Sequence, residues 1–173
     1  MKHLLVTNDF PPKRGGIQSY LWELWRRLPA EEVTVFTTPH PDAEAWDREQ
    51  PFRVVRSRHP VLLPIPAVVR DVRALAHEVG AEIVILDPAV PVGLIGPRLR
   101  LPYGVILHGA EVTVPGRVAG FRSLLRSVLV GATTVIAAGG YPADEGELAA
   151  GRGLPVTVVP PGVDSERFRP LDA

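Results

Sequence analysis

The chain has 173 residues, a length that suits one domain with a sizeable hydrophobic core. Lysine plus arginine and aspartate plus glutamate each number 19, and the zero net charge excludes a strongly basic nucleic-acid binder or an acidic tail. The absence of cysteine excludes disulfides, thiolate zinc sites and a cysteine nucleophile. No apolar run approaches the roughly 20 residues of a membrane-spanning helix, and the apolar start of the chain is too short for a signal peptide. We therefore expect a cytoplasmic protein; peripheral contact with the cytoplasmic face of the plasma membrane stays open.

Apolar, β-rich runs alternate with helical patterns along nearly the whole chain. We expect strands at residues 3–7, 33–37, 52–56, 83–86, 104–107, 134–137 and 156–159. We expect helices at residues 17–28, 67–79, 92–99, 117–130 and 143–150. Most of the strand runs are continuously apolar, which is typical of strands covered on both faces. The alternation predicts an α/β, Rossmann-like, three-layer domain with a mostly parallel sheet of about seven strands.

Ligands of such sheets bind at the carboxyl ends of the strands, so the loops that follow strands are the candidate sites. After the first strand, residues 8–16 end in Gly15-Gly16, directly before a predicted helix. Glycine lets the backbone approach a ligand, and a helix N-terminus favours phosphate or diphosphate. A simple capping turn would give the same pattern. The spacing is neither that of a dinucleotide-binding fingerprint nor that of a P-loop, and the second strand ends in Thr37-Thr38 rather than in an acidic residue.

The loop after the fifth strand is His108-Gly109-Ala110-Glu111. It places His108 at the end of a central strand, where an imidazole can hydrogen-bond a sugar hydroxyl or a developing charge. A histidine satisfied by a backbone carbonyl is the alternative. The other histidines lack ligand spacing, so we expect no metal site. A serine-hydrolase elbow is also absent from the sequence.

Two groups of arginines have less specific meanings. The helix at 117–130 carries Arg117, Arg122 and Arg126 and no acidic residue, which suits either an anionic membrane surface or, more commonly, a solvated face. The second group either serves an anionic acceptor or is solvated; it consists of Arg56, Arg58, Arg70 and Arg73.

Several motifs make the chain resemble the family-four GT-B glycosyltransferases, and among them the actinobacterial phosphatidylinositol mannoside mannosyltransferases. The likeness covers essentially the whole chain. The motifs are Thr7-Asn8-Asp9-Phe10-Pro11-Pro12-x-x-Gly15-Gly16-Ile17-Gln18-Ser19-Tyr20, Leu63-Pro64-x-Pro66, His108-Gly109-x-Glu111 and Pro160-Pro161-Gly162-Val163-Asp164-x-x-Arg167-Phe168-Arg169-Pro170. One stretch departs from the family, because residues 137–142 lack the serine that relatives carry after the sixth strand.

The resemblance implies a retaining, metal-independent hexosyltransferase made of two Rossmann-like domains. Residues 1–173 would be the N-terminal, acceptor-side domain, inactive alone, and a C-terminal domain absent from this chain would hold most of the nucleotide sugar. The subgroup implies GDP-mannose as donor and phosphatidylinositol mannoside as acceptor. A UDP-sugar with another acceptor, or a free-standing glycolipid- or phosphate-binding module, are the alternatives.

The resemblance also assigns roles to residues. Gly15 and Gly16 would direct backbone N–H groups at the donor diphosphate, and His108 would be catalytic, contacting the transferred sugar near its reacting centre. The acceptor side would include Asp9, Gln18, Tyr20 and Glu111.

Overall fold

A computed structural model describes residues 1–109 and 119–163. Its centre is a seven-stranded sheet in the order β3-β2-β1-β4-β5-β6-β7, and every pairing is parallel. The strands are β1 (His3–Thr7), β2 (Val33–Thr37), β3 (Arg53–Arg56), β4 (Ile83–Asp87), β5 (Tyr103–Leu107), β6 (Thr134–Ala137) and β7 (Val156–Val158). All seven expected strands are present, within one residue at each end, and the predicted fold class is confirmed.

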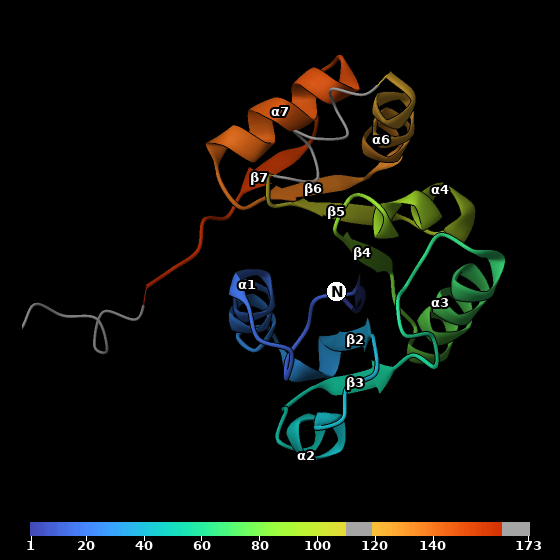
Figure 1. The fold of residues 1–173 in the computed structure, drawn as a ribbon, viewed down its shortest axis with the longest axis vertical. Helices are drawn as coiled ribbons and strands as arrows, with labels where there is room; N and C mark the ends of the chain where they lie inside the picture. Colours follow the sequence, from blue (N-terminus) through green and yellow to red (C-terminus); the bar gives the residue numbers. More distant parts are fainter. Residues whose placement is uncertain (110–118, 164–173) are drawn as a thin grey trace, which may run out of the picture.

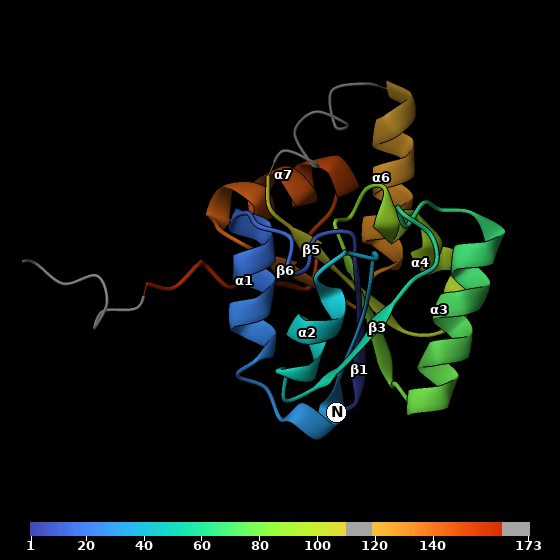
Figure 2. The same ribbon diagram turned by 60° about the horizontal axis from the view of Figure 1, so that its bottom comes forward.

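Helices cover both faces of the sheet (Figures 1 and 2). One face carries α1 (Gly16–Trp25) and α2 (Ala43–Arg48), whereas the other carries α3 (Pro66–Val79), α4 (Gly96–Leu99), α6 (Ala119–Gly131) and α7 (Gly140–Ala150). Each face has its own hydrophobic core, because side chains alternate along a strand. Thus Leu4 and Val6 of β1 pack on the α3 side, and Leu5 packs against α1. None of the helices in the described ranges is long and apolar enough to cross a bilayer.

The structure corrects three expected helices and adds one. The helix expected at 92–99 is divided into a 3-10 turn, η2 (Val92–Ile95), and α4, because Pro97 cannot continue the helical hydrogen bonds. The first helix ends at Trp25 rather than at residue 28, and α7 begins three residues early, at Gly140. The short α2 and the 3-10 turn η1 (Ala30–Glu32) were not expected. Residues 117 and 118 of the helix expected at 117–130 lie outside the described residues.

The strand order brings the ends of β1, β4 and β5 together beneath the start of α1. Thr7, the last residue of β1, is in register with Asp87, the last residue of β4. Their odd-numbered neighbours Leu5 and Ile85 belong to the core beneath α1, so Thr7 and Asp87 lie on that face. On β5, Ile106 belongs to the same core, which places His108 on this face, directly after the strand.

Candidate active site

Three polar side chains form a chain of contacts at the carboxyl ends of β1, β4 and β5. The Thr7 hydroxyl donates to Asp87 Oδ2 at 2.7 Å, and Asp87 Oδ1 lies 2.5 Å from His108 Nε2. Asp87 is fully buried, and the side chain of His108 is 10% exposed. Burial raises the pKa of Asp87, and the contacts with His108 and Thr7 oppose that rise because they stabilise the carboxylate. His108 therefore lies where its strand-end position predicts, beside a buried carboxyl group.

The sequence reasoning singled out neither Asp87 nor Thr7. A detectable signal was present, since Asp87 is an acidic residue that ends a continuously apolar strand. The expected strand, 83–86, ends one residue before Asp87, so Asp87 was not recognised as a strand-end residue.

Tyr20, expected on the acceptor side, lies against His108. The two rings meet edge to face with centroids 5.6 Å apart. The Tyr20 hydroxyl donates to the Val159 carbonyl at 2.7 Å, directly after β7, and the residue is 8% exposed. Burial raises the pKa of Tyr20, and the Asp87 carboxylate raises it further. Tyr20 thus connects α1 with the His108 imidazole and with the residue that follows β7.

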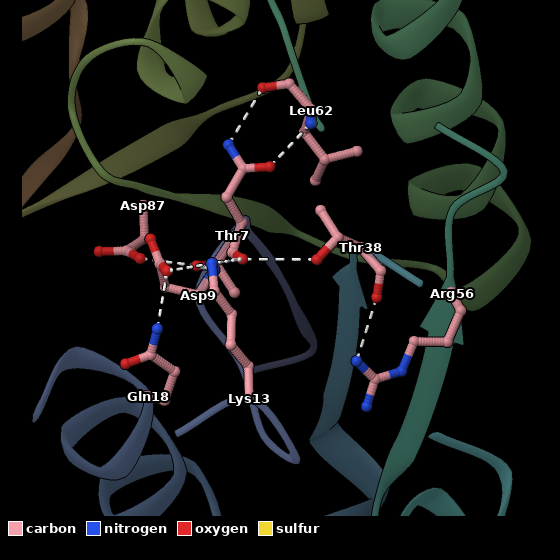
Figure 3. Close-up of polar contacts among 9 residues, drawn as sticks. Thr7, Asp9, Lys13, Gln18, Thr38, Arg56, Leu62 and Asp87 are labelled. Carbon is pink, nitrogen blue, oxygen red and sulfur yellow. Dashed lines mark hydrogen bonds and ion pairs between the residues drawn. The ribbon is translucent and has the colours of Figure 1, made fainter. Parts of the chain in front are cut away.

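Asp9, in the loop after β1, contacts Gln18, in the first turn of α1; both were expected on the acceptor side (Figure 3). Gln18 Nε2 donates to Asp9 Oδ1 at 2.7 Å, and Lys13 Nζ approaches the same oxygen at 2.9 Å. The Asp9 backbone N–H donates to Thr7 Oγ1 at 2.8 Å. Through Thr7, this loop is connected by hydrogen bonds to Asp87.

The start of α1 has the geometry of an anion site. Gly15 is the N-cap without a side-chain hydrogen bond, and the first helical bond runs from the Ser19 N–H to the Gly15 carbonyl at 3.1 Å. The N–H groups of residues 16–18 precede that bond, so the helix gives them no partner. Gly15 and Gly16 are exposed, and the first turn contains no acidic residue. This end of the helix can therefore receive a phosphate or diphosphate.

The two glycines are expected to differ when replaced. A Cβ on Gly15 would lie 2.2 Å from Gln18 Oε1, whereas a Cβ on Gly16 would meet nothing within 4 Å. Gly15→Ala should therefore turn the Gln18 amide away from Asp9 and lower the free energy of unfolding by about 1–2 kcal/mol. Gly16→Ala should leave stability equal or slightly higher, because alanine favours the helix. Urea unfolding and the side-chain amide signals of Gln18 measure the difference; equal losses in both variants would contradict it.

Arg56 anchors the loop between β1 and α1. Its guanidinium forms a bidentate ion pair with Asp47 at 2.6 and 3.0 Å, and donates to the carbonyls of Thr38 at 3.1 Å and Pro11 at 2.7 Å. Figure 3 shows Arg56 approaching Thr38 at the end of the neighbouring strand. Two roles were expected for Arg56, an acceptor contact or a solvated side chain. Its contacts instead give it a structural role.

Asn8 attaches the loop at residues 60–66, which contains three prolines, to the end of β1. Its Oδ1 accepts from the Leu62 N–H at 2.7 Å, and its Nδ2 donates to the Leu62 carbonyl at 3.2 Å. Beyond this loop, Arg70, Arg73 and Arg98 line a groove of about 630 Å³ together with Pro64 and Pro66. Arg58 and Arg70 are exposed and contact Asp71.

Two further expectations concern the role of Glu111 and the absence of a metal site. Glu111, expected on the acceptor side, lies outside the described residues. Within residues 1–109 and 119–163, no group of three or more histidine, aspartate or glutamate side chains is arranged to hold a metal ion.

Solved structures share this fold. Anabaena HepE, in complex with UDP, matches 96% of this chain with a TM-score of 0.72 at 19% identity, over 45% of its own length. Sucrose-phosphate synthase from Thermosynechococcus elongatus matches 98% of this chain with a TM-score of 0.72 at 18% identity, over 50% of its own length. The chain therefore shares the Rossmann-like α/β fold of these structures.

The family follows from the sequence match. The family model described as Glycosyltransferase Family 4 matches residues 14–167, and the chain belongs to this family. Among curated proteins, the chain is 40% identical over 177 residues to the GDP-mannose-dependent alpha-(1-6)-phosphatidylinositol monomannoside mannosyltransferase of Mycobacterium tuberculosis. It is 30% identical over 175 residues to a Corynebacterium glutamicum enzyme that uses the monoacylated form of that acceptor, according to its name.

Those matches cover 96% and 98% of this chain but 46% of each relative. The chain therefore spans about half the length of the curated relatives that it matches.

Proposed function

We propose that this chain is the acceptor-side half of a retaining family-four hexosyltransferase. The observation that carries the proposal is the contact between α1 and His108 at the carboxyl ends of the strands: the Tyr20 ring, about one turn after the Gly15-Gly16 helix start, lies 5.6 Å from the imidazole. The identity of 40% to a GDP-mannose-dependent mannosyltransferase makes mannose the expected sugar and GDP-mannose the expected donor. A phosphatidylinositol mannoside, or a related lipid-linked sugar, is the expected acceptor.

The leaving group of such a reaction is a nucleoside diphosphate, which gains negative charge as the bond to the sugar breaks. N–H groups of Gly15 and Gly16 at a helix N-terminus suit that charge, and they are placed before the reaction begins. His108 is then the residue that contacts the transferred sugar near its reacting carbon. Asp9, Gln18, Tyr20 and Glu111 belong to the acceptor side in this proposal. We expect no metal ion in the reaction.

The remaining contacts to the donor require residues that this chain does not contain. Because the chain matches 46% of the relatives' length, we propose that a second domain follows it and holds the nucleotide base and most of the donor sugar. A lipid-linked acceptor would bring the protein into peripheral contact with the cytoplasmic face of a membrane.

An assay of the complete gene product tests the proposal. The protein is incubated with GDP-mannose, UDP-glucose or UDP-N-acetylglucosamine and with a membrane lipid extract, and the product lipid is identified by mass. We expect mannose transfer from GDP-mannose by the complete product and none by the 173-residue chain. Turnover by the chain alone, or a gene that ends directly after Ala173, would contradict the division into two domains. Absence of transfer from every donor would contradict the proposed activity.

A further inference from the structure

The buried carboxyl group of Asp87 has no role among the contacts assigned so far, yet it lies against the proposed catalytic imidazole. We propose that Asp87, oriented by Thr7, is a positioning residue that fixes both the orientation and the protonated nitrogen of His108. The inference rests on the proposed function only for its consequence in catalysis; its structural content can be measured independently.

The direction of the hydrogen bonds around Thr7 is determined by chemistry. The Asp9 backbone N–H donates to Thr7 Oγ1 at 2.8 Å, and a backbone amide cannot accept in return. The hydroxyl proton of Thr7 is then directed to Asp87 Oδ2, 2.7 Å away. One carboxylate oxygen is therefore occupied as an acceptor, and the other, Oδ1, faces His108 Nε2 at 2.5 Å.

Burial disfavours the charged form of Asp87, but the Thr7 hydroxyl donating to Oδ2 and the His108 contact at Oδ1 both stabilise it. In the proposed arrangement Asp87 is therefore a carboxylate, which only accepts, and the proton between Asp87 and His108 belongs on Nε2. When the imidazole is neutral, its lone pair is then on Nδ1, and when it is charged, the nearby carboxylate stabilises it. A carboxylate bonded to one imidazole nitrogen fixes the tautomer and the orientation of the ring. Because Asp87 is fully buried at the end of a central strand, the partner that it offers His108 is rigid.

The neighbouring strand offers a matched control. Thr37 ends β2 in register with Thr7, and both threonines are fully buried. Thr7 Oγ1 donates to Asp87, whereas Thr37 Oγ1 has no hydrogen-bond partner within residues 1–109 and 119–163. Replacing each by the isosteric valine separates the effect of the Asp87 contact from that of losing a buried hydroxyl.

The test measures which nitrogen of His108 carries the proton, by NMR of the 173-residue chain with ¹⁵N-labelled histidine. We expect the Nε2–H form in the wild type. In Asp87→Asn, the oxygen of the amide accepts from Thr7 and its NH₂ group points at Nε2, so the spectrum should shift toward the Nδ1–H form. Thr7→Val should shift the His108 signals in the same direction, toward the Nδ1–H form. Thr37→Val should leave them unchanged.

Catalysis is measured in parallel on the complete gene product. Asp87→Asn should lower kcat at least roughly 10-fold, because an amide in place of the carboxylate favours the wrong tautomer of the imidazole, with KM for the acceptor nearly unchanged. An Nδ1–H form in the folded wild type, or spectra identical in wild type and Asp87→Asn, would overturn the positioning role. So would an unchanged kcat in a folded Asp87→Asn enzyme. If the wild-type gene product transfers no hexose, the proposed activity fails, and the spectra still decide the role of Asp87.

Discussion

Replacing His108 with alanine in the complete gene product is expected to lower kcat for hexose transfer at least 100-fold, at the lower end of the range for a positioned imidazole. The side chain lies at the carboxyl end of β5, between the Asp87 carboxyl group and the Tyr20 ring. Alanine removes the polar group that would contact the transferred sugar, while the start of α1 remains in place. The loss should therefore fall on kcat more than on donor binding, and steady-state kinetics with GDP-mannose and lipid acceptor measure both.

His77→Ala is a suitable control, because His77 is exposed at the end of α3, on the opposite face of the sheet. Thermal unfolding of both variants is required to show that they are folded. His108→Ala removes the imidazole and leaves the buried Asp87 with Thr7 as its remaining described side-chain partner. A folded His108→Ala enzyme with wild-type activity would remove this residue from the reaction.

The second large effect is expected on stability. Arg56→Ala should lower the free energy of unfolding by about 3 kcal/mol, since breaking a largely buried ion pair leaves the remaining charge uncompensated. The side chains of Arg56 and Asp47 are 14% and 19% exposed, and the variant also leaves the carbonyls of Thr38 and Pro11 without this donor. Arg56→Lys should recover only part of the loss, because an ammonium group cannot form the bidentate pair and reach both carbonyls.

Urea unfolding of the 173-residue chain measures this difference. Arg58→Ala provides the control, because that side chain is 71% exposed and its partner Asp71 keeps a contact with Arg70. We expect a change of less than about 0.5 kcal/mol there. A loss below about 1 kcal/mol in Arg56→Ala would contradict the structural role assigned to Arg56.

The sheet could be read from the sequence because its strands are continuously apolar and are separated by helical patterns. β1, β2 and β6 have the expected bounds, and the other strands differ by one residue at an end. The expected helix across 92–99 is wrong because apolar periodicity does not register the effect of Pro97 on the backbone. α2 was missed because it is only six residues long and shows no extended apolar period.

The candidate site could be predicted only in part. The position of His108 could be predicted because strand ends carry ligands in parallel sheets, a rule that needs no knowledge of the strand order; its role stays a prediction. Asp87 and Thr7 require that order, since they meet only because β1 lies beside β4 and β4 beside β5. Arg56 was misjudged for the same reason: its partners Asp47 and Pro11 come from α2 and from the loop after β1. Tertiary neighbours of this kind are not encoded in local spacing.

The most direct test of the central claim is a crystal structure of the complete gene product with GDP bound. The proposal predicts that a diphosphate oxygen lies within about 3.2 Å of the backbone nitrogen of Gly15 or Gly16. It also predicts that His108 borders the space next to the outer phosphate, where the sugar would be attached. A diphosphate bound without contact to residues 15–16, with His108 facing away from it, would contradict the assignment of this sheet edge as half of the active site.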